Sequence, residues 1–378
     1  MPSPRAVGTV TRAGVAAAIA AAQFGLAYRF ALAYRARAGY PRRFPPTMSP
    51  PDFGLPFEPT VVRSDELELP AWFIPARDGK PGPGVALIHG WESARDRTLP
   101  LALFLHAAGY HCLTIDIRGH GENPAEALPV SAGEFGLDAL AAFRALIDRP
   151  EVTAGAIVGH SMGAIGAVLA AAADPQVAAM VATSTPADPY RLTRQTFRLA
   201  RLPIPDPIAY PLAWFTTRVF LRPRGHIVTD ISATDAIARY RGPILLAHGD
   251  EDQVVPFAHL ARVAAAARRA RVGDQDANPV ETLVVPGGQH SWLYEEPAYR
   301  AEMARFLAVA LHGPMAPDEA AAVAAATHAE RIPAAEEQTS AVDDLPGGFR
   351  TLVQVALPGA TRVRDVDTLA TADEPGLG

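Results

Sequence analysis

A glycine-x-serine-x-glycine pentapeptide is the feature of this chain best suited to covalent chemistry. It runs from Gly159 to Gly163, reads GHSMG and has Ser161 at its centre. Residues 156–158 before it have the apolar character of a buried strand, and the Ala-rich segment that begins at Met162 is typical of a helix. We therefore predict that Ser161 lies on a sharp strand-to-helix turn. Such a turn needs glycine on both sides and exposes the serine hydroxyl as a nucleophile.

A serine nucleophile needs a base and an acid that orients the base, and both must come from elsewhere in the chain. Two further buried-strand patterns follow the pentapeptide, at residues 242–248 (GPILLAH) and 280–286 (VETLVVP). The loop after the first carries Asp250 and Asp252, and the loop after the second carries His290. The order serine, aspartate, histidine is that of a catalytic triad built from successive strand ends.

These motifs together resemble the α/β-hydrolase family, in its serine-aminopeptidase-like and esterase-like group. The sequence HGDEDQVVP is similar to the family loop His-Gly-x-x-Asp-x-x-Val-Pro, and GGQHSW is similar to the loop that carries the catalytic histidine. LIHGW resembles the oxyanion turn after the third strand, and DIRGHG resembles the end of the fourth. The resemblance covers roughly residues 51–311. It assigns the acid to Asp252, while Asp250 remains the alternative because loop register is uncertain by a residue or two.

The resemblance implies a triad of Ser161, Asp252 and His290, and an oxyanion hole formed by the backbone N–H groups of Trp91 and Met162. In this mechanism His290 takes the proton of Ser161 as the hydroxyl attacks a carbonyl, and then returns it to the leaving group. Water hydrolyses the acyl-enzyme. The chemistry requires no cofactor and no metal, and the histidines show no ligand spacing such as His-Glu-x-x-His.

The rest of the chain alternates between buried-strand and helix patterns, which predicts a mostly parallel central sheet with helices on both faces. Strands are expected in two alternating runs within 60–74, and at 85–89, 110–117 and 177–184; helices are expected at 98–109 and 132–147. A chain of 378 residues, of which 49% are hydrophobic, can bury one core of this size. Its net charge of −6 does not suggest a nucleic-acid partner.

The amino-terminal part, residues 1–50, is predicted to be an apolar helix followed by a Pro-rich linker. Its apolar run, 14–28, is about 15 residues long, whereas a full membrane span needs roughly 20. A cleaved signal peptide, a retained anchor and an amphipathic surface helix are the three alternatives. We favour a retained membrane-associated helix, because no convincing cleavage site closes the run before Arg29. More arginines follow the run than precede it, which predicts a cytoplasmic catalytic domain; an exported or a soluble cytoplasmic protein is the alternative.

Residues 51–312 are expected to form the hydrolase domain, interrupted at about 185–240 by an irregular stretch rich in arginine, proline and aromatic residues. We predict a helical cap there, long enough to be functional. Most of its aromatic residues should attach the cap to the body, and a few should line the acyl pocket. Residues 313–378 are acidic and predicted to be a disordered tail, with one helix near 318–331 and an apolar stretch at 349–357.

The expected function is hydrolysis of a small-molecule carboxylic ester, or of a thioester or small amide, through an acyl-enzyme on Ser161. The alternatives are an acyltransferase, an aminopeptidase-like enzyme and a non-catalytic membrane-tethered binding module. An aminopeptidase must hold the substrate's amino terminus with anionic groups, but arginines outnumber aspartates in the cap. Together the cap and the apolar helix suggest amphiphilic acyl substrates taken from or near a membrane. Oligomeric state does not follow from the sequence.

Overall fold

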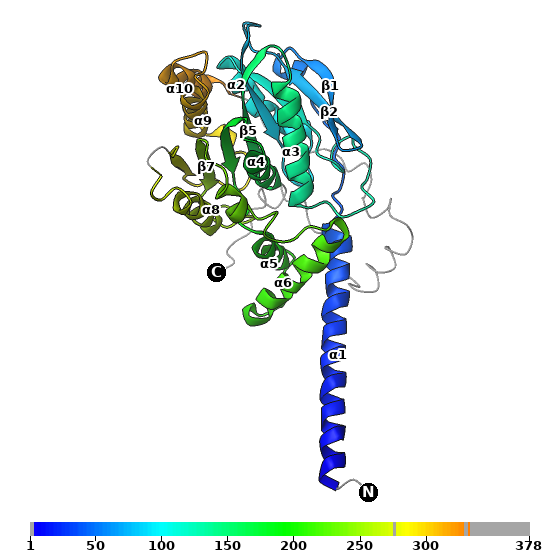
Figure 1. Cartoon of the computed structure of the whole chain (residues 1–378). Coiled ribbons are helices and arrows are strands. Elements are labelled where there is room, and N and C mark those ends of the chain that lie inside the picture. Colours follow the sequence, from blue (N-terminus) through cyan, green and yellow to red (C-terminus); the bar gives the residue numbers. More distant parts are fainter. Residues whose placement is uncertain (1–3, 275–276, 329–331, 333–378) are drawn as a thin grey trace.

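An eight-stranded sheet forms the centre of the protein in the computed structural model, which describes residues 4–274, 277–328 and 332 (Figure 1). Its strand order is β1-β2-β4-β3-β5-β6-β7-β8. The strands are β1 (Glu58–Ser64), β2 (Leu67–Ile74), β3 (Gly82–Ile88), β4 (His111–Ile115), β5 (Val152–His160), β6 (Val177–Thr183), β7 (Ile244–Gly249) and β8 (Val280–Val285). β1 and β2 pair antiparallel, as does β2 with β4, and the remaining pairs are parallel. The predicted fold class is confirmed.

Helices cover both faces of the sheet, because successive side chains of each strand point to opposite sides. In β3, Ala86 and Ile88 belong to one hydrophobic cluster, whereas Val85 and Leu87 belong to the other. The first cluster is completed by α3 (Ala132–Ile147), α4 (Met162–Ala173), α7 (Ala233–Ile237) and α8 (Ala258–Arg269). The second is completed by α2 (Leu99–Ala107), α9 (Pro297–Ala310) and α10 (Pro317–Ala326).

Local sequence signals explain where several elements begin. α3 has the predicted bounds because Ser131 and Glu134 cap its first turn reciprocally: the Ser131 hydroxyl accepts from the Gly133 N–H, and the Glu134 carboxylate accepts from the Ser131 N–H at 2.7 Å. The helix predicted near 318–331 forms as α10. The apolar stretch 349–357 and most of the acidic tail lie outside the described residues.

The Pro-rich segment after the first helix is packed against the body. The Arg42 side chain pairs with Glu92 at 2.9 Å, and the Thr47 backbone N–H donates to the buried Asp96 at 2.8 Å. Leu55 is buried in the same cluster as α2. This segment therefore holds the start of the hydrolase body in a defined place relative to the helix before it.

The first helix, α1 (Pro4–Ala38), projects from the body as a single rod (Figure 1). Its part from Gly14 to Ala38 is long and apolar enough to cross a membrane, and within its most apolar window only 6% is buried inside the protein. The carboxyl end is different: Ala31, Ala33 and Ala36 are buried.

Two helices of the 185–240 region, α5 (Pro189–Leu199) and α6 (Asp206–Leu221), lie beside the carboxyl half of α1 (Figure 1). The Tyr34 ring lies edge-on to Phe197 of α5 at 5.6 Å and is tilted against Phe220 of α6 at 6.0 Å. The third helix of the region, α7, packs in the main core instead. The projecting structure is thus the α5–α6 pair, joined to α1.

Candidate active site

Ser161 occupies a strained turn between β5 and α4. Its φ is +53°, a region that non-glycine residues adopt only under constraint. The constraint is close packing: a Cβ on Gly159 would lie 2.2 Å from the Gly163 carbonyl oxygen, and a Cβ on Gly163 would lie 2.3 Å from the His89 carbonyl oxygen. Both glycines are therefore required by the backbone on either side. The turn has the geometry predicted for a nucleophile elbow.

Two neighbouring segments fix the surroundings of Ser161. Its backbone N–H donates to the Thr183 carbonyl at the end of β6 at 2.9 Å. The turn after β3 approaches from the other side, since a Cβ on Gly90 would lie 3.5 Å from the Ser161 Cβ. Trp91 follows this Gly90, and Met162 is the first residue of α4, where a backbone N–H has no acceptor within its own helix. Both expected oxyanion donors thus belong to segments that adjoin Ser161.

His290 and Asp252 meet although 38 residues separate them, because β7 and β8 are parallel neighbours whose carboxyl ends share one edge. The His290 Nδ1 lies 2.8 Å from the Asp252 Oδ2, and both side chains are buried. Asp250 points elsewhere: its Oδ1 accepts from the Gly287 N–H at 2.7 Å, at an exposed position. The structure therefore places Asp252, and not Asp250, on the imidazole.

The Asp252 carboxylate is held ionised by its partners. Burial by itself raises its pKa, but attraction to His290 and hydrogen bonds from His248 and His290 outweigh burial and bring the pKa well below its usual value. Its Oδ1 also accepts from the backbone N–H groups of Val254 and Val255, at 2.9 and 2.8 Å. These two donors leave Oδ2 directed at the histidines.

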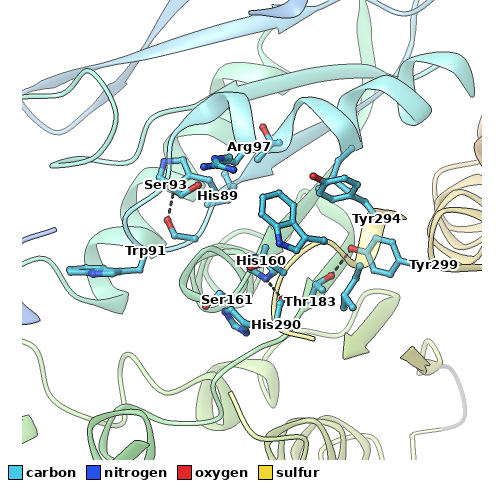
Figure 2. A pocket seen from close by; sticks show the side chains of 17 residues that line it. His89, Trp91, Ser93, Arg97, His160, Ser161, Thr183, His290, Tyr294 and Tyr299 are labelled. Carbon is cyan, nitrogen blue, oxygen red and sulfur yellow. Dashed lines mark hydrogen bonds between the residues drawn. The ribbon is translucent and has the colours of Figure 1, made fainter. Parts of the chain in front are cut away.

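The second nitrogen of His290 is directed away from Asp252. His290 Nε2 is buried and has no hydrogen-bond partner among the described residues, and His290 and Ser161 line the same pocket (Figure 2). An imidazole in this position, with Nδ1 on a carboxylate, is arranged to accept a proton at Nε2. Hydrogen bonds of this kind are often long before a substrate binds.

His160 lies closer to this chemistry than the sequence indicated. The variable residue of such a pentapeptide usually points away from the reacting groups, and the pattern predicts this for His160. In the structure its Nε2 donates to the His290 carbonyl at 2.7 Å, and the two rings are 4.8 Å apart (Figure 2). This difference from the expectation has a physical reason: the loop after β8 reaches the last residue of β5, and no local pattern in the sequence reports a contact between residues 130 positions apart.

The other buried polar residues of the motifs have structural roles. The His89 Nε2 accepts from the Ile117 N–H at 3.0 Å, so its Nδ1 carries the proton and donates to the Gly90 carbonyl at 2.7 Å. This tautomer ties the turn after β3 to the end of β4. The buried Asp116 accepts from the Arg95 N–H at 2.7 Å, and Arg118 forms an ion pair with Asp138 at 2.6 Å. These bonds order the strand-end turns beside the site.

The pocket around Ser161 and His290 is mostly apolar and aromatic (Figure 2). Its 17 lining residues come from the end of β3 and the turn after it, from the start of α2 and the short helical turn before it, from the ends of β5 and β6, from the elbow, and from the region after β8. Trp292, Leu293, Tyr294 and Tyr299 form one wall, and Arg97 is the only cationic side chain other than histidine among the lining residues. Among the residues that the structure describes, no Asp or Glu lines this pocket.

The cap does not contribute to the pocket, which corrects the expectation that some of its aromatic residues line it. None of the lining residues falls within 185–240. The aromatic wall comes instead from the segment after His290, because the left-handed Trp292 (φ +69°) begins a short helical turn there. The sequence contained a signal for this wall, since tryptophan and tyrosine lie within four residues of His290.

Among the described residues, no group of three or more His, Cys, Asp or Glu side chains could hold a metal ion.

Comparison with known proteins shows which family this chain belongs to. The sequence pattern of the alpha/beta hydrolase family matches residues 85–303, more than half of the chain. This chain belongs to the α/β-hydrolase family. The match begins in β3 and ends in α9, so it includes the elbow and both downstream loops of the hydrolase domain.

Relatives and solved structures agree with that assignment. An uncharacterized protein of Mycobacterium tuberculosis is 30% identical over 234 residues, which is 61% of this α/β-hydrolase and 71% of the relative. An esterase of Pyrococcus furiosus is similar with a TM-score of 0.56 at 21% identity, covering 72% of this chain and 100% of the esterase. An acylaminoacyl peptidase of Pyrococcus horikoshii has a TM-score of 0.50 at 18% identity, covering 68% of this chain and 42% of the peptidase. The likeness to the two solved structures shows that this chain shares their fold.

Proposed function

We propose that this α/β-hydrolase cleaves carboxylic esters through an acyl-enzyme on Ser161. The observation that carries the proposal is the coincidence of three features at one site: a serine on a strained elbow, a buried histidine in the same pocket whose Nε2 has no hydrogen-bond partner among the described residues, and a buried aspartate behind the pocket on the histidine Nδ1. Strain of this kind persists only where the surroundings enforce it, and it is typical of functional sites. A structural serine would need none of the three.

In the proposed reaction the Ser161 Oγ attacks the ester carbonyl while His290 Nε2 takes the hydroxyl proton. The backbone N–H groups of Met162 and Trp91 stabilise the tetrahedral oxyanion, each contributing about 3 kcal/mol. Collapse of the intermediate breaks the bond to the alcohol, which leaves with the proton from His290. Water then attacks the acyl-enzyme with His290 again as base, and the carboxylic acid and free Ser161 are released.

The lining of the pocket favours esters over peptides with a free amino terminus. Recognition of an ammonium group needs an anionic partner. In the described part of the chain no acidic side chain lines the pocket, and the cationic side chain of Arg97 does line it. The Arg97 guanidinium lies 5.6 Å from the Trp292 ring and donates to the Ile332 carbonyl at 3.1 Å, so it is held at the rim of the aromatic wall. An apolar acyl or alkoxy group would be buried against Trp292 and Leu293.

We further propose that α1 remains on the mature protein and holds it at a membrane. The helix combines an apolar segment of sufficient length with little burial inside the protein, and arginines at positions 29, 35 and 37 follow the apolar run. The excess of arginines on that side favours a cytoplasmic hydrolase domain. Its buried carboxyl end argues against removal near residues 31–33, because cleavage there would remove Phe30, whose ring lies edge-on to Phe197 of α5 at 5.3 Å.

A labelling experiment tests the nucleophile. A fluorophosphonate should modify the wild-type protein at one site, and Ser161→Ala should abolish both the labelling and the hydrolysis of p-nitrophenyl butyrate. Ser93→Ala is the matched control, because Ser93 is a second buried serine that lines the same pocket. Persistent labelling of Ser161→Ala by intact mass, or loss of labelling in Ser93→Ala alone, would refute the assignment.

A further inference from the structure

The outer face of α6 is an exposed stripe of apolar and aromatic side chains. Ile208, Tyr210 and Trp214 are 57%, 41% and 49% exposed. Pro207 and Pro211 are exposed beside them, and Arg218 continues the stripe toward the body. Residues 207, 211, 214 and 218 follow helical spacing, so they lie on one side of α6. The opposite side, with Ala213, Thr216 and Thr217, is buried.

This stripe adjoins the part of α1 that has membrane-spanning character. Phe24 of α1 lies edge-on to Phe215 of α6, with ring centroids 5.5 Å apart, and Phe24 is itself 63% exposed. Phe215 follows Trp214 directly. The solvent or lipid that surrounds α1 at the level of Phe24 must therefore also contact α6 (Figure 1).

The depth of this contact can be worked out from helix geometry. Arg29, the first charged residue after the apolar run, marks the edge of the hydrocarbon region. Phe24 precedes it by five residues, which at about 1.5 Å per residue places Phe24 roughly 7 to 8 Å further in. Amphipathic helices that lie on a bilayer insert their apolar faces by about 5 to 10 Å. The Trp214 face of α6 would thus lie at the depth where such helices bind.

The residue types on α6 fit the boundary between headgroups and acyl chains. Tryptophan and tyrosine are enriched there because each has an apolar ring and a polar tip. The Arg218 guanidinium lies 3.2 Å from the Trp214 ring centroid, and Arg194 of α5 lies 4.2 Å from the Tyr210 ring. Arg194 is paired with Asp206 at 2.7 Å, whereas the exposed Arg218 is placed to bind a headgroup phosphate while the Trp214 ring enters the apolar layer.

We propose that α6 is a membrane-docking helix, which lies in the bilayer interface beside α1 and orients the hydrolase domain on the lipid surface. The inference rests on the proposed membrane attachment of α1. The partner that contacts the exposed stripe of α6 is a phospholipid bilayer with anionic headgroups. The structure supports a role of these residues as a lid over the active site less well, because no residue of α5 or α6 lines the pocket.

Tryptophan quenching by brominated phospholipid tests the proposal. The full-length Ser161→Ala protein, which cannot consume ester lipids by the proposed route, is reconstituted into vesicles of phosphatidylcholine with about 25% of the anionic lipid phosphatidylglycerol, with brominated or ordinary acyl chains. Of the four tryptophans, only Trp214 is among the exposed large hydrophobic residues. Brominated chains should lower the emission, and Trp214→Phe should abolish this loss while Trp292→Phe retains it.

Reporter substitutions in the Trp214→Phe background provide matched controls. Tyr210→Trp, on the same stripe, should restore the quenching. Val309→Trp should not, because Val309 is 60% exposed on α9, which packs with α10 away from the free end of α1 (Figure 1).

Two results would overturn the proposal, and they are distinguishable. If the protein floats with vesicles but Trp214→Phe leaves the quenching unchanged, α6 does not enter the interface, although α1 anchors the chain. A second copy of the chain packed on the stripe would give this result, because it would shield Trp214. If the protein does not float with vesicles, the proposed attachment by α1 fails as well. The labelling of Ser161 is independent of both outcomes.

Discussion

Replacing Asp252 by asparagine should reverse the hydrogen bond that sets the tautomer of His290. Asp252 Oδ1 accepts from two backbone N–H groups, of Val254 and Val255, at 2.9 and 2.8 Å. Those donors require an acceptor, so the amide oxygen of Asp252→Asn keeps that place and the amide nitrogen faces His290 Nδ1 at the position of Oδ2. A donor there forces Nδ1 to accept, and the ring proton moves to Nε2.

A proton on Nε2 prevents His290 from acting as base toward Ser161. Loss of the correct tautomer in a serine triad lowers kcat by roughly 10⁴-fold, and this corresponds to about 5 kcal/mol of transition-state stabilisation. Binding of the ester should change little, because Asp252 is not among the residues that line the pocket. The effect should therefore fall on kcat and leave KM nearly unchanged.

Asp250→Asn is the matched control, since it makes the same chemical change two residues away. Its Oδ1 accepts from the Gly287 N–H at 2.7 Å, and the amide oxygen of asparagine can still accept this bond. Steady-state hydrolysis of p-nitrophenyl butyrate by both variants, with far-UV circular dichroism to verify folding, gives the comparison. A larger loss in Asp250→Asn, or a kcat within tenfold of wild type in Asp252→Asn, would refute the reasoning.

Two further predictions concern histidines outside the proposed triad. His160→Ala should lower kcat about tenfold, the worth of one hydrogen bond that positions His290, whereas His160→Gln, which can still donate to the His290 carbonyl, should recover most of it; equal rates for both variants would contradict a positioning role. Burial, followed by repulsion from His248, lowers the pKa of His259 from 6.5 to about 4, while its Nδ1 accepts from the Ala187 N–H. The unfolded chain therefore binds a proton below pH 6.5 that the folded chain takes up only near pH 4, and stability falls on acidification. Chemical denaturation of His259→Asn, which keeps an acceptor for Ala187, should show a loss between pH 7 and pH 5 that is smaller by about 2 kcal/mol, and an unchanged loss would refute this explanation.

The order of strands and helices could be predicted from the sequence because each element carries its own signal. The predicted helix 132–147 has the bounds of α3, since the residues that cap it are neighbours in the chain. The predicted strand at 280–286 ends one residue beyond β8. Gly159 and Gly163 indicated the elbow because only a turn too tight for side chains needs both.

Contacts between distant loops could not be predicted in this way. His160 meets the His290 carbonyl across 130 residues, and the pocket wall at Trp292 faces the turn after β3. Which of Asp250 and Asp252 contacts His290 also depended on tertiary structure. The backbone N–H groups of Val254 and Val255 bind Asp252, and the N–H group of Gly287 binds Asp250, so the loop directs only Asp252 at the imidazole. Identical carboxylates two residues apart carry no such information in their sequence.

In the 185–240 region, too, the sequence predicted the elements and the tertiary structure decided their contacts. Its composition indicated a helical insertion with an apolar aromatic surface, and the chain forms α5 and α6 there. Which way that surface points was decided by packing: Phe197 and Phe220 turn toward Tyr34, and this leaves Trp214 on the outside rather than over the active site. Residue types and spacing thus determined the elements and their chemistry, since these depend on neighbours in the chain. Only the tertiary structure decided which side chains meet, because burial of apolar surface is shared among segments that the sequence keeps far apart.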